Sequence, residues 1–411
     1  MRPLGAPSAR PPRASPSIGR MTAFTALLPA AALLAAATAL PPPHTAHAGP
    51  AAATPTAPYV VVLKDTATRA PAARALAAEA AESGDKVGAV YDTALSGFAV
   101  RTTAARAAAL AVDPRVASVE PDAEFHTSDA QNPAPWPLDR IDQRELPLDG
   151  SYTYAAKARG VTAYIVDTGI NTRHQEFGGR ARAGHNAVFF ESSADCNGHG
   201  THVAGTVGGA TYGVAKGVSL VAVKVADCRG SASLSDILSG LDWLVKDAAK
   251  APGTPAVANM SLGGTRSFAL DAAVMRAVAS GITVTVAAGN EGADACTGSP
   301  ARVRQALTVA ATDARDRRPA FSNYGSCVDL SAPGVAVTSA WKGSATALAR
   351  ATGTSMAAPH VAGVAALILA DGIAKTPAQV AAALVRGAVS DHISGLPAGT
   401  PNLLLHTPTD K

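Results

Sequence analysis

Aromatic side chains and clustered charge are both scarce in this 411-residue sequence. Phe, Trp and Tyr make up only 4% of the residues, so the chain has few of the stacking platforms that bind single-stranded nucleic acids. The formal net charge is +4 and no long Lys/Arg run occurs, so no basic tract marks a nucleic-acid or membrane-surface partner. We therefore expect no nucleic-acid partner. Hydrophobic residues make up 47% of the chain, enough to form a substantial core.

Long apolar runs are also scarce, and the one that approaches a membrane span lies near the N-terminus, over residues 23–40. Arginines precede it, and Ala46-His47-Ala48 follows it as an A-x-A cleavage pattern. A membrane anchor is the alternative, but the run is rich in alanine, contains Pro29 and is followed by three prolines rather than a basic flank. We predict a signal peptide over residues 1–48 and a secreted, extracellular protein that has no membrane association after export.

Cysteine occurs four times, and no Cys-x-x-Cys pair is present. An even number of cysteines in an exported protein favours two disulfides, for which three pairings are possible. A zinc site is the alternative, but cysteines spaced about thirty residues apart are poor zinc ligands.

The pattern of residues 59–127 predicts a small α+β domain. Strand-like and helix-like segments follow one another in the order β-α-β-β-α-β, which is the ferredoxin-like pattern. The proline-rich stretch 126–137 is typical of a boundary or linker that proteases can reach.

Later in the chain, short apolar strands alternate with helices. The predicted strands are 161–167, 218–225, 256–262, 282–288 and 306–312. Ser233 and Asp236 resemble a capping box at the start of one helix, and another helix is expected from Ser267 to Gly281. Near-continuous apolar strands between helices indicate an α/β fold with a mostly parallel sheet covered on both faces. In such folds ligands bind beyond the carboxyl ends of the strands.

Three residues suited to nucleophilic catalysis occur in the order Asp, His, Ser. Asp167 ends the first of these strands, His199 lies in the glycine-rich stretch "NGHGTH" (197–202), and Ser355 lies in a glycine-led turn before an apolar helix. A serine hydroxyl is a weak nucleophile until a base removes its proton, and that base needs a carboxylate to orient it. Gly353 permits a tight turn, and a helix start provides backbone N–H groups near Ser355.

Other interpretations use parts of the same pattern. His202 follows His199 by three residues, and a helical His-x-x-His pair can share a metal ion, so spacing alone leaves a metal site open. "DTG" at 167–169 also occurs in aspartic proteases, but their chemistry needs a second carboxylate and no second copy is present. An α/β-hydrolase would require the order Ser, Asp, His.

Five motifs together resemble the subtilisin-like serine proteases: "YIVDTGI", "NGHGTHVAGT", "NMSLGG", "VAAGN" and "GTSMAAPHVAG". The segments "APWPLDRIDQRELPLDGSYTY" and "FSNYGSCVDLSAPG" resemble the proteinase K branch, and within it the aqualysin-type secreted proteases. The resemblance covers about residues 130–405. It implies a subtilisin-like three-layer α/β fold and a serine endopeptidase.

The resemblance also implies roles for individual residues. Asp167, His199 and Ser355 match the catalytic triad, and Asn290 matches the asparagine that forms the oxyanion hole with the Ser355 N–H. His202 then matches a helix residue beside the base, and no catalytic metal is expected. The residues that match the substrate-binding segments and the pocket for the residue before the cut are Ser261, Leu262, Gly263, Gly230, Ala287, Ala288 and Gly289. Small side chains there imply broad preference for apolar or aromatic residues, with substrate bound by β-augmentation.

Residues 49–129 resemble the inhibitory propeptide of the same family, with the inhibitor domain at about 59–127 and the peptidase domain at 130–411. The expected partners are protein and peptide substrates and the chain's own propeptide, which would act as intramolecular chaperone and inhibitor of a monomeric, self-processing zymogen. We place the maturation cut between Phe125 and Pro133. An exported relative that binds peptides without cutting them is the alternative, but such a protein would be expected to lack a residue of the triad or the asparagine.

Disulfides and calcium are implied by the resemblance as well. Relatives with this cysteine spacing pair Cys196 with Cys228 and Cys296 with Cys327. A first structural Ca²⁺ site is expected from oxygen donors of the proteinase K branch pattern at Asp139, Asp142, Gln143, Asp149 and Ser151. A second is expected at Asp329 with the backbone carbonyls of Arg304 and Ala306. The alternative for the first cluster is a solvated acidic turn in which Asp139 pairs with Arg140 or Arg144.

Overall fold

The computed structural model describes residues 55–64, 69–93, 95–122, 129–154 and 157–408, and they form two compact units that divide between Ala123 and Glu124. The predicted signal peptide lies outside the described residues. Within the part of the chain that is described, none of the helices combines the length and the apolar character needed to cross a bilayer.

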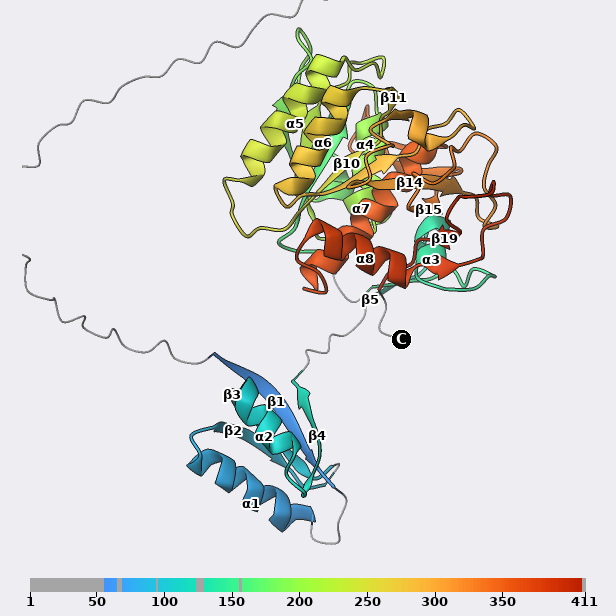
Figure 1. The fold of residues 1–411 in the computed structure, drawn as a ribbon. Coiled ribbons are helices and arrows are strands. Elements are labelled where there is room, and N and C mark those ends of the chain that lie inside the picture. Colours follow the sequence, from blue (N-terminus) through green and yellow to red (C-terminus); the bar gives the residue numbers. More distant parts are fainter. Residues whose placement is uncertain (1–54, 65–68, 94, 123–128, 155–156, 409–411) are drawn as a thin grey trace, which may run out of the picture. The chain divides into compact units, whose positions relative to one another are not determined.

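The N-terminal unit is a four-stranded antiparallel sheet with two helices (Figure 1). The strand order is β2-β3-β1-β4, in which β1 pairs with both β3 and β4. Val61, Leu76 and Phe98 are buried between sheet and helices. The elements are β1 (Thr56–Leu63), α1 (Arg69–Glu82), β2 (Lys86–Tyr91), β3 (Gly97–Thr103), α2 (Ala104–Ala111) and β4 (Val116–Pro121). This order and pairing confirm the ferredoxin-like prediction.

The second unit is built on a nine-stranded sheet in the order β18-β19-β15-β14-β12-β10-β7-β9-β8. All neighbouring strands from β8 to β19 run parallel, and only β18 is antiparallel. The bounds are β7 (Thr162–Asp167), β8 (Ala181–Asn186), β9 (Ser219–Lys224), β10 (Ala256–Met260), β12 (Thr283–Ala287), β14 (Leu307–Thr312), β15 (Leu330–Pro333), β18 (Val389–Ser390) and β19 (Leu403–Leu404). The predicted mostly parallel sheet is therefore confirmed.

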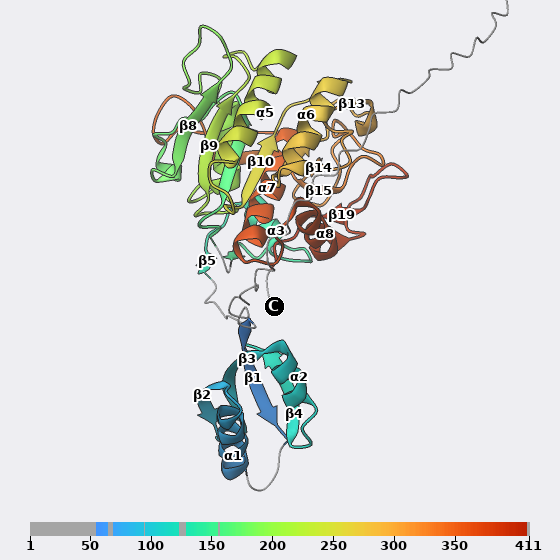
Figure 2. The ribbon, with the colours of Figure 1, turned by 60° about the vertical axis from the view of Figure 1, so that its left-hand side comes forward.

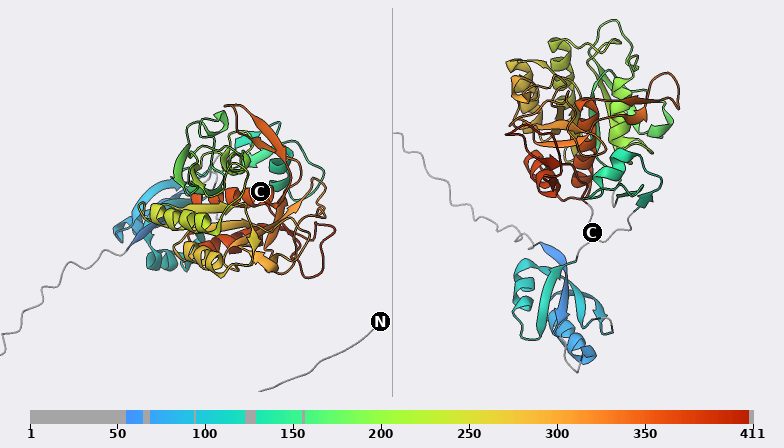
Figure 3. Two further views of the ribbon diagram at one scale, coloured as in Figure 1. Left: turned by 90° about the horizontal axis from the view of Figure 1, so that it is seen from above. Right: turned by 90° about the vertical axis from the view of Figure 1, so that its right-hand side faces the viewer.

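Helices cover this sheet on both faces (Figures 2 and 3). The central helices α4 (His199–Gly208) and α7 (Thr354–Ala370) pack against each other and share one apolar core with the sheet. On the other face, α5 (Leu234–Ala248) and α6 (Phe268–Ala279) lie side by side over a second core. Ser233 and Ser267 cap these two helices by accepting the N–H groups of Asp236 and Leu270, because serine oxygens satisfy the free donors of a first turn.

Short elements complete the unit. They are β5 (Asp129–Gln131), α3 (Trp136–Ile141), β6 (Tyr152–Tyr154), η1 (Gln175–Phe177), β11 (Gly264–Thr265), η2 (Ala295–Thr297), β13 (Gly298–Ser299), β16 (Val337–Ala340), β17 (Leu348–Ala351) and α8 (Pro377–Gly387). The structure differs here from the linker expected over 126–137. Strand β5 pairs with β6, and the side chain of Gln131 bonds to Thr211 and Lys216, so the end of that stretch belongs to the folded unit.

Candidate active site

Asp167 and His199 form a hydrogen-bonded pair at the carboxyl end of the parallel sheet. Nδ1 of His199 lies 2.8 and 2.9 Å from the two carboxylate oxygens of Asp167. Asp167 is 3% exposed and also accepts the Thr168 N–H. Burial by itself would lower the pKa of His199, but the charge and hydrogen bond of Asp167 outweigh it, so that pKa is raised above its usual 6.5. These contacts orient the imidazole and leave Nε2 as the ring nitrogen that does not face Asp167.

The start of α4 is held close to Asp167 by Asp195, a residue that our sequence analysis did not single out. The Asp195 carboxylate accepts the N–H groups of Asn197, Gly198 and Thr201, and also the hydroxyls of Thr168 and Thr201. These bonds satisfy donors that the first helical turn leaves free. The aspartate two residues before "NGHGTH" was the only local sign of this cap.

Glycine is required where α4 meets the strand that carries Asp167. A Cβ at Gly200 would overlap the carbonyl oxygen of Gly169, and a Cβ at Gly198 would overlap the ring of Trp341. The φ angle of Gly198 is also 107°, a conformation that other residues rarely adopt. The glycines that flank His199 therefore permit the close approach that places its ring beside Asp167.

Ser355 lies in the first turn of α7, whose first N–H groups have no partner within the helix. Its hydroxyl donates to the carbonyl oxygen of Ser261 at 3.2 Å. No hydrogen bond among the described residues joins this hydroxyl to His199 Nε2, and such bonds often tighten only in a substrate complex.

A buried polar chain supports Ser355 from the sheet. The Ser261 hydroxyl donates to the carbonyl oxygen of Ser355 at 2.7 Å, and Asn259 donates to that hydroxyl at 2.8 Å. Thr285 in turn donates to Asn259. Asn259 and Thr285 were missed as supporting residues because the pattern "NMSLGG" gives no sign that the asparagine points at a neighbouring strand.

Asn290 follows β12 and lies beside the start of α7. Its side-chain oxygen accepts the N–H and the hydroxyl of Thr354, at 2.8 and 3.0 Å. The amide group is thereby oriented with its Nδ2 donor available to a ligand. Asn290 and Ser355 line the same cavity.

That cavity, of about 450 Å³, is lined by the predicted pocket residues Ala287, Ala288 and Gly289 together with Leu262 and Gly263. Apart from Leu262, these five residues have small side chains or none.

Two further residues shape this cavity and were not predicted. Glu291 lines it, and its carboxylate accepts the Asn323 side-chain N–H at 2.8 Å. Asn323, which is 6% exposed, also donates to the Ala288 carbonyl and accepts the N–H groups of Glu291 and Ala293. Asn323 thus fixes the strand end that forms one wall.

A second cavity, of about 380 Å³, lies beside the first and shares Leu262 and Gly263 with it. Ser261 to Gly263 line it, and they extend just beyond the end of β10 instead of lying within it. Arg229, Gly230, Asp167 and His199 also line this cavity. Residues of both predicted substrate segments therefore line one groove.

His202 is a buried residue of α4, and its hydrogen-bond partner differs from that of His199. It is 0% exposed, and its Nε2 lies 3.0 Å from the carbonyl oxygen of Val337. Burial lowers the pKa of His202 to about 4. Each of the two imidazoles thus has its own partner, and they do not form a shared ligand pair.

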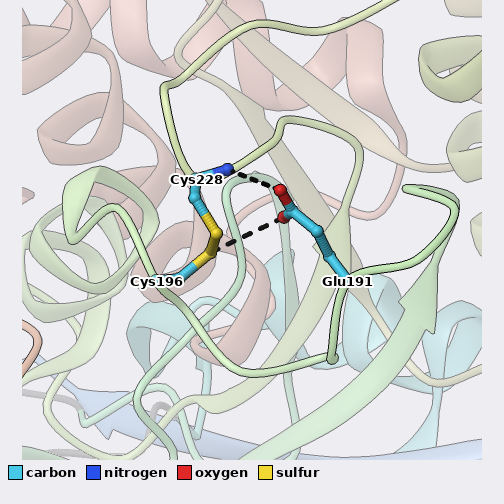
Figure 4. Close-up of side chains that lie close together, drawn as sticks. All are labelled: Glu191, Cys196 and Cys228. Carbon is cyan, nitrogen blue, oxygen red and sulfur yellow. Dashed lines mark hydrogen bonds between the residues drawn. A yellow bond between two sulfur atoms is a disulfide. The ribbon is translucent and has the colours of Figure 1, made fainter.

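The structure contains two disulfides, Cys196–Cys228 and Cys296–Cys327, which are the pairs that the resemblance implied. The first joins the segment before His199 to the segment before Gly230. Glu191 lies against it (Figure 4). Within the described ranges, Glu191 and these two cysteines are the only three His, Cys, Asp or Glu residues whose ligand atoms gather within 4.8 Å, and the disulfide occupies both sulfurs.

The first expected calcium cluster contains a buried carboxylate that forms no ion pair with any of the residues that the structure describes. Asp139 is 3% exposed and accepts the N–H groups of Asp149 and Gly150. Burial raises the pKa of Asp139, and the nearby Asp149 carboxylate adds to that effect. Arg140 does not pair with Asp139, because it forms a buried ion pair with Asp316 at 2.8 Å.

The other residues of this cluster bond to backbone and to one another. Asp142 accepts the Thr153 N–H, Gln143 accepts the Asp149 N–H, and Ser151 donates to Asp149. The Asp139 and Asp149 carboxylates are close enough to interact, which suits a hard cation, but the ligand oxygens of Asp139, Asp142 and Asp149 do not all lie within 4.8 Å of one another.

Asp329 is the carboxylate of the second expected cluster. It accepts the Thr308 N–H at 2.8 Å, and burial raises its pKa to about 6 despite the charge of Arg304. The Arg304 guanidinium donates to the carbonyl oxygen of Ser326. Asp329 would offer a cation one half-buried carboxylate, and the other ligands of this site would be backbone carbonyls.

Comparison with known proteins agrees with this geometry. Residues 158–404 match the model of the Subtilase family, and residues 58–128 match Peptidase inhibitor I9. The chain is 52% identical over 369 residues to the "Extracellular serine proteinase" of Thermus sp. (strain Rt41A), which covers 85% of this chain and 89% of the relative. It is 49% identical over 332 residues to "Alkaline serine exoprotease A" of Vibrio alginolyticus, covering 79% and 61% of the two chains.

A solved structure of a cold adapted subtilisin-like serine proteinase is 51% identical, with a TM-score of 0.65, and covers 68% of this chain and 100% of that one. The chain therefore belongs to the subtilase family, which confirms the resemblance. It is a serine endopeptidase with an I9-type inhibitor domain ahead of the peptidase domain.

Proposed function

We propose that Ser355 is the nucleophile of this endopeptidase, His199 its general base and Asp167 the carboxylate that orients the base. The observation that best supports this proposal is the Asp167–His199 pair on the groove that adjoins the cavity of Ser355. His199 Nε2 takes the proton of Ser355 as the oxygen attacks the scissile carbonyl carbon. The imidazolium then protonates the leaving amine, and a water molecule hydrolyses the acyl-enzyme by the same steps.

Asn290 and the backbone of Ser355 supply the donors for the tetrahedral intermediate. Thr354 holds the Asn290 oxygen, so the Nδ2 group is preorganised to donate to the developing oxyanion. The Ser355 N–H, at the positive end of α7, is the second donor.

Substrate binds as an extended strand between the segments 229–232 and 261–263. The residue before the cut enters the larger cavity, whose small side chains support broad preference for apolar and aromatic groups.

A fluorophosphonate probe tests the nucleophile directly, since it labels only an activated serine. Wild-type protein should be labelled at Ser355, whereas Ser355→Ala and His199→Ala should abolish both labelling and peptide hydrolysis. Ser394→Ala changes an exposed serine that lines neither cavity and should label normally. Full hydrolysis by Ser355→Ala would refute the assignment.

We also propose that the protein is secreted and activates itself. The proposed segments are a signal peptide at 1–48, a propeptide at 49–129 and the peptidase domain at 130–411. The I9 match and the name of the Thermus relative as extracellular support this proposal. A Ser355→Ala precursor should then accumulate at full length minus its signal, and N-terminal sequencing of wild type should locate the cut. Normal processing of the variant would mean that another protease removes the propeptide.

Calcium is proposed as a structural ion. Asp139, Asp142, Gln143, Asp149 and Ser151 would hold one ion, and Asp329 with the carbonyls of Arg304 and Ala306 a second. Each bound ion would stabilise the folded state by mass action, by about 2.7 kcal/mol at a hundredfold excess over its dissociation constant.

EDTA should therefore shorten the half-life on heating and leave the initial rate unchanged. Asp142→Ala and Asp329→Ala should each remove part of the calcium dependence. The control is Asp242→Ala, which changes a residue of an exposed ion pair and should leave the calcium dependence unchanged. Identical inactivation curves with and without calcium in the wild type would refute both sites.

A further inference from the structure

Lys224 is a buried charged residue that the proposed reaction does not use. It is the last residue of β9, where it lies in register with Asp167, and its side chain is 0% exposed. A buried ammonium group persists only if it is paired and hydrogen-bonded. Its partners therefore show which parts of the structure it holds together.

The ammonium group contacts three chain segments. It donates to the carbonyl oxygen of Thr168 at 2.9 Å and to that of Ala226 at 3.1 Å. It also contacts the Glu191 carboxylate at 3.1 Å and Cys196 Sγ at 3.7 Å. Lys224 thus connects the residue after Asp167, the start of the 226–231 segment and the loop that precedes His199.

Glu191 extends this connection to the disulfide. One carboxylate oxygen accepts the Cys228 N–H at 3.1 Å, and the other lies 3.6 Å from Cys196 Sγ (Figure 4). Asn197, next to the disulfide, donates to the carbonyl oxygen of Cys228 at 3.1 Å.

The segment held in this way is an internally bonded turn. Asp227 accepts the N–H groups of Arg229 and Ser231 through its carboxylate, and its own N–H donates to the Ser231 carbonyl oxygen. Because these bonds lie within the turn, the contacts that attach it to the rest of the unit are those at Ala226 and Cys228. Arg229 and Gly230 of this turn line the groove together with Leu262 and Gly263.

We propose that Lys224 is a positioning residue for extended substrates, since its ammonium group sets the position of the 227–231 turn and hence the groove width. This inference rests on the proposed function, in which the groove binds substrate residues that precede the residue in the larger cavity. Lys224 contacts neither substrate nor reacting atoms. Loss of the Lys224 ammonium group should therefore weaken the binding of substrates that extend along the groove and leave the hydrolysis of short substrates unchanged.

Lys224→Met removes the charge and keeps most of the side-chain length. The matched control is Lys216→Met. Lys216 is a half-buried lysine whose ammonium group also bonds backbone carbonyls, at Ala210 and Gly213, but it lines neither cavity. Each variant is assayed with a peptide p-nitroanilide that has four residues before the cut and with a single-residue ester that fills only the larger cavity. Active-site titration with a fluorophosphonate corrects for misfolded protein.

For Lys224→Met we expect KM of the four-residue substrate to rise about tenfold while kcat of that substrate and kcat/KM of the ester stay within about threefold of wild type. Lys216→Met should lower the thermal midpoint and leave the ratio of the two kcat/KM values unchanged. An unchanged ratio in Lys224→Met, or an equal change in Lys216→Met, would overturn the positioning role.

Glu191→Gln provides a second test if Lys224→Met fails to fold, because glutamine keeps an acceptor for the Cys228 N–H and loses the ion pair. It should raise KM of the four-residue substrate about threefold and spare the ester. If the ratio of the kcat/KM values for the two substrates in Glu191→Gln equals that of wild type, the proposal is contradicted. Ester hydrolysis that no longer depended on Ser355 would instead refute the proposed function, so the two failures are distinguishable.

Discussion

Asn290 shows how a side chain is preorganised for one bond. Its oxygen accepts from Thr354, so the Nδ2 group is the part of the amide left for the bond that we propose to a developing oxyanion. We expect Asn290→Ala to lower kcat by about 10²- to 10³-fold, the range known for the oxyanion-hole asparagine of subtilisin, a member of the same family, whose role we propose for Asn290. Steady-state kinetics on a peptide substrate measure this effect.

Asn290→Asp is the sharper control, because aspartate still accepts from Thr354 but has no N–H to donate. It should lose at least as much kcat as Asn290→Ala while retaining the fold. Near-normal turnover by Asn290→Asp would exclude the oxyanion role.

The pH dependence of activity should report the ionisation of His199. In the proposed mechanism only the neutral imidazole of His199 accepts the proton of Ser355, and the carboxylate of Asp167 outweighs burial to raise the pKa of His199 above 6.5. kcat/KM should therefore be maximal above that raised pKa and fall as the pH decreases through it. The acid limb of a kcat/KM profile checks this, and an apparent pKa below 6.5 would contradict the expected balance.

At the scale of elements, the first turn of α4 carries His199 and is held by the side chain of Asp195. Asp195 satisfies several buried donors of this turn and also holds Thr168, the neighbour of Asp167. Removal of its carboxylate leaves these donors without a partner, each at a cost of about 1–3 kcal/mol. The start of this helix thus links stability to activity.

We expect Asp195→Ala to lower the free energy of unfolding by at least about 2 kcal/mol and to lower kcat, because the His199 ring loses its fixed position. Ser233→Ala, at the exposed start of α5, should cost about 1 kcal/mol and leave kcat unchanged. Denaturant unfolding of inhibitor-blocked protein, together with kinetics, compares the two caps. Equal effects of both variants on kcat would contradict the special role of the α4 cap.

At the scale of the whole molecule, three buried histidines make the peptidase unit sensitive to acid. Burial lowers the pKa values of His202, His360 and His406 to about 4. In the unfolded chain each has a pKa near 6.5, so the unfolded state binds protons that the folded state excludes between pH 6.5 and 4. The stability that these groups contribute is complete above pH 6.5 and decreases as the pH falls toward 4.

Each histidine should reduce the free energy of unfolding by about 1.4 kcal/mol per pH unit across this window. Denaturant midpoints of inhibitor-blocked protein between pH 8 and pH 4 measure the total slope. His360→Gln removes one titrating group and should give a shallower slope than wild type, whatever its stability at pH 8. Parallel pH profiles for the two proteins would show that His360 does not contribute.

The amino-acid sequence by itself determined the elements and the residue types of the site. Strands such as β7 and β9 are mostly apolar because both faces of the sheet are covered. Ser233 and Ser267 cap helices by accepting N–H groups only three residues further along the chain. These signals are local, so they can be read along the chain. The motifs that carry Asp167, His199 and Ser355 are local as well.

Only the tertiary structure decided which distant residues support those motifs. Ser261 and Ser355 are 94 residues apart, and Arg140 and Asp316, whose ion pair removes Arg140 as a partner for Asp139, are 176 apart. Lys224 and Glu191 follow no helical or strand period that would reveal their pairing. Parallel strands bring such residues to one edge of the sheet through crossover connections, and the contacts made there leave no pattern in the neighbouring sequence.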